Sequence, residues 1–448
     1  MLKIKPIFIT ILFAILLSTF LAKINLDEFD KLDRDKHLMI VGDINLIWQE
    51  AETFKNDILE GKTYFDSGKE YTRTYLPSKI VALYSILNNS NLFKNFDKKI
   101  VNTGEKFYLL LFQIIFYYLC LYFFYKALVN FYSNVKIPNY ITFFLCLEPT
   151  ILQYHISFWT ESIYCSLLII LMTLIISKNS SNLKFIYIGF ILGMMYLQKT
   201  VSIFLIFPVI FYFFISEKDK KIYKILNIII IYLFVLIFLG FHNYKKTGIF
   251  YVLPIQTKSA HYAYILPQIF EKNKNISYEE FSNTNENNWK IENNFDPNSF
   301  VDNYKFSNYK QKLALKEILD NKILTTKIYI KKIIHHILLN PVQNYYWHEY
   351  NKEKYEIEYH LSEDKKKWII WRIIYSFIIY LIILIGLIGI IKHNLKLKFH
   401  IFLILAVIYY AFMLGWVGNT RYFTPSIIII SIFFGNGINS ILNFYKKK

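Results

Sequence analysis

Long apolar segments recur along almost the whole chain, and they constrain its fold more than any other feature. A helix needs roughly 20 mostly apolar residues to cross the hydrocarbon layer of a membrane, with about 17–25 as the usual range. Ten segments approach or reach that length, and they predict an all-α integral membrane protein with about ten transmembrane helices. The segments cover about 6–23, 107–130, 138–153, 161–177, 185–198, 200–215, 225–241, 368–391, 400–416 and 422–438. The pair that meets at Gln198-Lys199-Thr200 is read either as two spans or as one kinked element.

Composition excludes the soluble classes. Hydrophobic residues make up 54% of the 448 residues and charged residues 19%, whereas a soluble domain has about 45–50% apolar and about 25% charged residues. All three cysteines lie inside apolar runs, which indicates neither a disulfide nor a metal site. The net charge of +18 comes from cations beside the apolar runs. Anionic membrane lipids are therefore the expected partner, and nucleic acid is not.

The distribution of lysine predicts the orientation of the spans. If the N-terminus is cytoplasmic, the cytoplasmic pieces are 1–5, 131–137, 178–184, 216–224, 392–399 and 439–448. They hold fifteen lysines but only two acids, Glu217 and Asp219. Cytoplasmic loops carry the excess of Lys and Arg in membrane proteins. Both termini are therefore expected in the cytoplasm, and two long segments, 24–106 and 242–367, are expected on the outer face.

The two outer segments contain helical patterns. Residues 43–60 and 309–339 carry apolar positions at three-to-four spacing, which predicts amphipathic helices on the outer face of the bundle. The part between them, 271–308, is rich in Asn, Glu, Lys and Ser and is expected to form a mobile loop. The chain then divides into an N-terminal transmembrane module (1–253), an outer segment with helices (254–367) and C-terminal transmembrane helices (368–448).

Ionisable groups at membrane depth are costly, so each one marks a candidate site. The expected topology places most of them at one level on the outer face. They are Asp43, Glu161, Lys199, Lys245, Lys246, Lys258 and Arg421. A carboxylate can accept a proton from an attacking hydroxyl, and cations can hold a phosphate and stabilise the charge of a leaving group. The pattern favours group transfer from a lipid-linked phosphate, with a transporter as the alternative.

Several short motifs in chain order resemble those of the GT-C membrane glycosyltransferases. The resemblance is to bacterial relatives of the dolichyl-phosphate-mannose protein mannosyltransferases and to the lipid A aminoarabinose transferases. The motifs are Gly42-Asp43, Pro77-Ser78-Lys79, Glu148-Pro149-Thr150 with Thr160-Glu161, Gly193 with Gln198-Lys199-Thr200, Asn243-Tyr244 with Gly248-Ile249-Phe250, and Arg421-Tyr422-Phe423-Thr424-Pro425.

The resemblance implies a GT-C-like fold and a glycosyltransferase that uses a polyprenyl-phosphate sugar and inverts the anomeric carbon. The acceptor would be a lipid, glycan or protein on the outer face of a bacterial inner membrane. In this reading Asp43 takes the proton of the acceptor and Glu161 positions a sugar or a cation. Arg421, with Lys199 or Lys258, holds the phosphate, and Lys245 and Lys246 are further phosphate contacts.

Each assignment has a structural alternative. Asp43 is also a good helix N-cap, and Glu161 is also favoured by a helix dipole. Arg421 and the outer lysines can reach lipid headgroups.

No cofactor is expected, because the chain has neither a Walker loop nor a dinucleotide fingerprint. The sequence also supports no metal ion, since His335, His336, His348 and Glu349 lack a ligand spacing. The alternative function, a transporter or flippase of a lipid-linked or anionic substrate, would need polar groups through the membrane depth or two related halves.

Overall fold

The computed structural model is all-α over the residues that it describes. These are 6–31, 42–68, 75–93, 102–132, 134–155, 160–178, 181–273, 277–338, 397–417 and 423–446, with a few single positions between 374 and 386. Within those ranges every regular element is a helix and no strand occurs. The all-α part of the predicted fold class is therefore confirmed for these residues.

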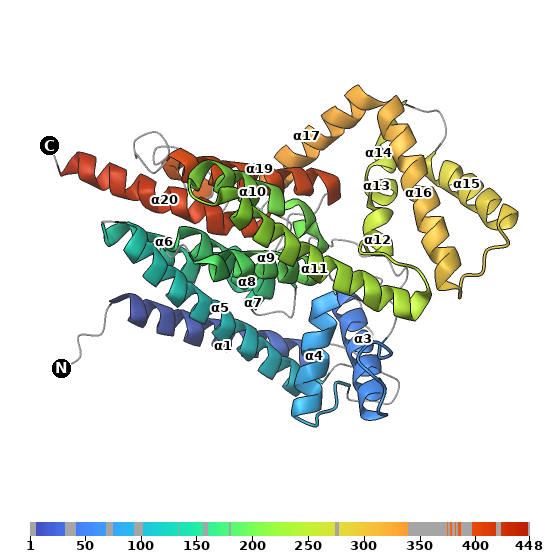
Figure 1. Cartoon of the computed structure of the whole chain (residues 1–448), viewed down its shortest axis with the longest axis horizontal. Coiled ribbons are helices and arrows are strands. Elements are labelled where there is room, and N and C mark those ends of the chain that lie inside the picture. Colours follow the sequence, from blue (N-terminus) through green and yellow to red (C-terminus); the bar gives the residue numbers. More distant parts are fainter. Residues whose placement is uncertain are drawn as a thin grey trace.

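Four of the described helices are long and apolar enough to cross a membrane. They are α1 (Pro6–Lys31, apolar over Pro6–Ile24), α5 (Thr103–Phe131), α11 (Lys221–Thr247) and α20 (Thr424–Tyr445). The start of α1 and the end of α20 lie at the same end of the bundle (Figure 1), as expected if both face one side of a membrane. The opposite end of the bundle is here called the outer end.

Shorter helices occupy most of the other predicted spans. They are α6 (Lys136–Leu147), α7 (Pro149–His155), α8 (Thr160–Ile176), α9 (Asn182–Gln198), η1 (Thr200–Phe204), α10 (Ile206–Ser216) and α19 (Leu397–Val417). Most of the predicted span 368–391 lies outside the described residues. The total of ten spans is therefore still a prediction.

Two breaks interrupt the predicted apolar segments, one within a segment and one between two neighbouring segments. The 138–153 segment divides at Glu148 because Pro149 has no N–H to continue the ladder. Two tyrosines of α5 compensate: the Tyr117 hydroxyl donates to the carbonyl of Leu145 at 3.3 Å, and the Tyr118 hydroxyl is 3.4 Å from the carbonyl of Cys146. At the second break, Lys199 takes an extended conformation (φ −156°, ψ 115°) between α9 and η1. The 185–198 and 200–215 segments are therefore two elements.

Close backbone packing holds the centre of the bundle. Gly189 and Gly193 lie four residues apart on α9, on the side that meets α11. A Cβ at Gly189 would lie 2.5 Å from the carbonyl oxygen of Ile228, and one at Gly193 would lie 2.7 Å from the Cβ of Val235. Small residues at this spacing let two membrane helices approach closely. Substitution of either glycine would therefore push α9 away from α11.

The outer end carries two groups of further helices (Figure 1). One group is α3 (Gly42–Leu59) and α4 (Tyr75–Leu87), and the other comprises α12 to α17. Its members are α12 (Ile255–Lys258), α13 (Ala260–Tyr264), α14 (Leu266–Asn273), α15 (Tyr278–Glu292), α16 (Phe300–Asp320) and α17 (Lys322–Leu338). Helix α3 matches the predicted helix at 43–60. The helical pattern at 309–339 is also confirmed, but a break at Asn321 divides it between α16 and α17.

The expectation of a loop over the whole of 271–308 is wrong. Helix α15 and the start of α16 occupy most of it, because hydroxyl caps begin both helices. The hydroxyl of Ser277 accepts from the N–H of Glu280, and that of Ser299 accepts from the N–H of Asp302. Trp289 of α15 then stacks on Phe306 of α16, with ring centroids 5.0 Å apart. The polar composition of the segment concealed this aromatic contact.

Candidate functional site

Two of the predicted site residues form a buried ion pair. The Nζ atom of Lys199 lies 2.6 Å from Oε1 of Glu161, and the side chains are 5% and 0% exposed. Helix α8 supplies Glu161 in its first turn, and the break after α9 supplies Lys199. The hydroxyl of Thr160 donates to the other carboxylate oxygen at 3.1 Å, and the amide of Gln198 donates to the carbonyl of Thr160 at 3.0 Å. The pair joins α8 to the end of α9.

A second buried polar group lies near this pair. Nδ1 of His155 is 2.9 Å from the hydroxyl of Ser162, and Gln113 donates to the carbonyls of Tyr154 and His155 at 3.0 and 3.1 Å. Glu148 is also buried, and it accepts a hydrogen bond from the N–H of Ile151 at 2.8 Å. These groups join α5, α7 and α8. In the sequence, Glu148 is named only as part of a motif, although an acid inside an apolar run and next to a proline is a recognisable signal.

A different set of residues meets at the outer end of α11, here called the Lys79 cluster. It consists of Phe54, Tyr64, Tyr75, Lys79, His242 and Lys246. The ammonium of Lys79 lies 3.4 Å from the centre of the Phe54 ring, 5.3 Å from that of Tyr75 and 5.9 Å from that of Tyr64. The two tyrosine hydroxyls form a hydrogen bond with each other. Three aromatic rings therefore surround one ammonium group.

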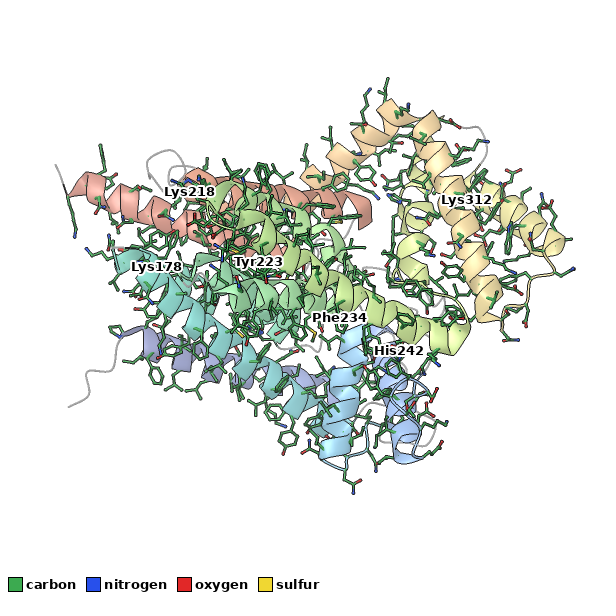
Figure 2. All side chains as sticks on the ribbon, viewed as in Figure 1. Lys178, Lys218, Tyr223, Phe234, His242 and Lys312 are labelled. Atoms are coloured by element: carbon green, nitrogen blue, oxygen red, sulfur yellow. The ribbon has the colours of Figure 1, made fainter. Side chains whose placement is uncertain are left out.

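Helix α11 completes the Lys79 cluster. The ring centre of His242 lies 5.1 Å from that of Tyr75 and 5.8 Å from that of Tyr64. Figure 2 shows His242 near the outer end of α11, beside α3 and α4. One turn further along α11, the ammonium of Lys246 donates to the carbonyl of Gly68 at 2.5 Å. The cluster thus links the outer group α3–α4 to a helix long enough to cross the membrane.

Gly68 shapes the turn that Lys246 reaches. Its φ of +85° lies in the region that favours glycine, and its N–H donates to the carboxylate of Asp57 at 2.7 Å. A Cβ at this position would lie 3.1 Å from the Nζ of Lys79. Any other residue would therefore strain the turn and crowd Lys79. The glycine lets the backbone approach Lys79 closely.

The electrostatics of the Lys79 cluster favour an anion. In the part of the chain that the structure describes, the ammonium of Lys79 has no ion pair, although α3 carries carboxylates nearby. Burial lowers the pKa of Lys79 to about 7, and the positive charge of Lys246 acts in the same direction. The carboxylates of Glu50 and Asp57 oppose the shift. An anion placed beside Lys79 and Lys246 would gain two charge-assisted contacts.

The other predicted phosphate contacts lie elsewhere. Lys258 donates to Oδ1 of Asn308 at 3.0 Å, and its ammonium lies 3.7 Å from the centre of the Tyr304 ring, so it engages α16. Lys245 is exposed. Asp43 is the second residue of α3, and its side chain lies outside the described part of the structure, as does all of Arg421. The structure therefore pairs Glu161 with Lys199, and it places Lys246 near Lys79, which the sequence offered only within a motif.

Among the residues that the structure describes, no three His, Cys, Asp or Glu side chains gather where they could hold a metal ion. The side chains of His335 and His336, together with His348 and Glu349, lie outside those residues.

Comparison with family models, with curated proteins and with solved structures gives no match to this chain. The resemblance to the GT-C enzymes therefore rests on the sequence motifs themselves.

Proposed function

We propose that this protein is a membrane glycosyltransferase that takes its sugar from a polyprenyl-phosphate donor. The acceptor is a lipid, glycan or protein on the outer face of a bacterial inner membrane. The observation that carries the proposal is the Lys79 cluster. Two ammonium groups from different elements, Lys79 and Lys246, meet beside aromatic rings at the outer end of a helix long enough to cross the membrane. A phosphate attached to a lipid tail can reach such a place without leaving the bilayer.

The chemistry of transfer assigns a role to each group. The acceptor hydroxyl attacks the anomeric carbon, a new carbon–oxygen bond forms, and the bond from that carbon to the phosphate oxygen breaks. Polyprenyl phosphate leaves with the electron pair and with more negative charge than it had in the donor. Lys79 and Lys246 hold that phosphate and stabilise the added charge. A carboxylate takes the hydroxyl proton.

Asp43 is the carboxylate proposed from the sequence, and Glu50 of the same helix is the competing candidate. A helix rises about 1.5 Å per residue, so Asp43, the second residue of α3, lies roughly 17 Å before Phe54 along the helix axis. Glu50 lies only one turn before Phe54, and its carboxylate raises the pKa of Lys79, which favours the charged ammonium. In this proposal the pair Glu161–Lys199 positions α8 against α9, because both side chains are buried and bonded to each other. Arg421 remains a proposed phosphate contact.

A transporter or flippase remains the second candidate, because one observation favours it. Glu148 is buried at the break between α6 and α7, inside a segment predicted to span the membrane. Broken helices with polar groups at membrane depth are typical of transporter substrate sites. The two functions differ in their products. A transferase releases polyprenyl phosphate, whereas a flippase moves the intact lipid-linked sugar across the bilayer.

The test uses the purified chain in proteoliposomes, with lipid-linked sugars extracted from a strain that lacks this protein. Loss of a charge-assisted hydrogen bond costs about 1.5–3 kcal/mol, so Lys79→Gln and Lys246→Gln should each weaken binding of polyprenyl phosphate about ten- to a hundredfold. Lys245→Gln is the matched control, since Lys245 is adjacent to Lys246 in sequence but exposed. An equal loss in Lys245→Gln would contradict the proposed site. Movement of intact donor without release of polyprenyl phosphate would favour the flippase.

A further inference from the structure

Helix α17 carries two apolar stripes, and its packing uses only one of them. Ile328 is buried with Ile265 and Ile269 of the neighbouring outer helices. On the same side, the Tyr329 hydroxyl is 3.0 Å from Nε2 of His261, and the Tyr329 ring stacks on Phe412 of α19 at 6.1 Å. This stripe attaches α17 to the outer helices and to the membrane bundle.

The second stripe has no cover among the residues that the structure describes. Ile323, Ile330 and Ile334 are 76%, 52% and 52% exposed. Positions 323, 327, 330 and 334 follow one another along one helix face, and Lys327 lies within the stripe while Lys331 adjoins it. Both lysines are exposed. An exposed apolar stripe of this kind is unusual on a helix surrounded by water.

Charge indicates what covers the second stripe. Residues 322–338 contain four lysines and no Asp or Glu. Helices with an apolar stripe, a lysine-rich flank and no acids bind anionic membrane surfaces, where the stripe enters the acyl boundary and the lysines meet the headgroups. Position supports the same partner: α17 runs from the distal end of α16 toward α19 and contacts it (Figure 1). The C-terminal half of α17 is therefore the half nearest the membrane.

We propose that the C-terminal half of α17 docks onto the outer leaflet of the bilayer, with Ile330 and Ile334 in the acyl boundary and Lys327 and Lys331 on anionic headgroups. The proposal is independent of the sugar-transfer function, because the residues of α17 that would contact lipid are not part of the Lys79 cluster. In this arrangement α17 connects the outer helices to the surface of the bilayer. The height of the outer helices above the bilayer then depends on this contact.

Spin labels at single cysteines test the proposal in the full-length chain, reconstituted in nanodiscs of phosphatidylcholine with about 30% phosphatidylglycerol. The three native cysteines are buried, so the unmodified chain serves as the labelling blank. The probes are Ile330→Cys and Ile334→Cys. Phe234→Cys on α11 is the lipid-exposed control, and Asn287→Cys on α15 is the water-exposed control. The readout is the accessibility of each label to oxygen and to a water-soluble nickel complex.

The two probes should resemble the Phe234 control, with an oxygen-to-nickel ratio within about twofold of it. The double variant Lys327→Gln/Lys331→Gln should lower that ratio in the anionic nanodiscs. A ratio that matches the Asn287 control would show a solvated stripe and overturn the proposal. Low accessibility to both reagents would show that protein covers the stripe, and it would overturn the proposal equally. A high ratio that the lysine variant leaves unchanged would refute the headgroup contact.

Discussion

Neutralising one partner of the Glu161–Lys199 pair should destabilise the protein more than neutralising both. Removal of one member of a buried ion pair leaves an uncompensated charge and costs about 3–5 kcal/mol. Glu161 is 0% exposed and Lys199 is 5% exposed, so solvent offers little compensation for either charge. Glu161→Gln and Lys199→Met should each show this cost. The double variant replaces the pair by neutral groups and should lie close to the wild-type stability.

The three buried cysteines provide the assay, because a thiol-reactive dye reports their exposure as the chain unfolds. Cys165 lies one helical turn after Glu161 on α8, so it reports on the region around the pair. An unfolding entropy of about 2.1 cal/mol/K per residue gives about 0.9 kcal/mol/K over the whole chain. Each single variant should therefore lower the midpoint of unfolding by about 3–5 °C. Lys245→Met, at an exposed site, is the control and should leave the midpoint unchanged.

Two results would refute this reasoning. A double variant as unstable as the sum of the singles would show that the two charges do not stabilise each other. A Lys199→Met variant with wild-type stability but without sugar transfer would place Lys199 in the donor site, as the sequence first suggested. Because stability and transfer are measured on the same preparation, the structural role and the phosphate-binding role of Lys199 can be distinguished.

Four further predictions follow from the topology and the site. A cysteine at Glu292 should react with an impermeant thiol reagent in intact cells and one at Asn443 should not, so reaction at Asn443 would reverse the orientation. Asp43→Asn should bind donor normally while turnover falls at least about a hundredfold; turnover within about threefold of wild type would make Asp43 a helix cap. Arg421→Ala should weaken donor use and Arg421→Lys should restore only part of it, because lysine lacks the bidentate fork; full activity in Arg421→Ala would remove it from the site. Donor affinity should fall as pH rises through about 7, because Lys79 loses its charge there. Lys79→Arg should abolish that fall, whereas a donor affinity of the wild type that does not change with pH would exclude Lys79 from the donor site.

The apolar runs predicted most of the helices and the interruption at Lys199, but not the one at Glu148. Run length depends on composition alone, so α5, α11 and α20 could be recognised from the sequence. The break at Pro149 was visible in principle, because proline cannot continue the hydrogen-bond ladder. The helix α15 was missed because its stability depends on contacts with α16 that no local pattern shows. Composition predicts which segments form long apolar helices more reliably than it predicts how the outer helices pack against one another.

The Lys79 cluster could not be assembled from the sequence. Lys79 and Lys246 are separated by more than 160 positions in the chain, and only tertiary folding brings them together. The sequence offered Lys79 within a short motif and Lys246 as one of several outer lysines. It could not separate Lys246 from Lys245, because the direction of a side chain depends on where α11 ends. Structure separates them: one reaches the carbonyl of Gly68, and the other is exposed.

Under the proposed function, the different environments of Lys199 and Lys79 make only Lys79 suited to an incoming phosphate. Lys199 already has a carboxylate at 2.6 Å, so a phosphate would have to displace an equally good partner.

Burial and the charge of Lys246 instead lower the pKa of Lys79 to about 7. Because this value lies below that of an unfolded lysine, the unfolded chain binds more protons between about pH 7 and 10, and stability should rise with pH across that range. Affinity for phosphate should fall over the same range, because the anion needs the charged ammonium. A bound phosphate would raise the pKa of Lys79 again, so donor binding at pH 8 should be accompanied by proton uptake. Opposite pH trends of stability and affinity are therefore the expected signature of a lysine that forms no ion pair within the described part of the chain and would gain an anionic partner when the proposed donor binds.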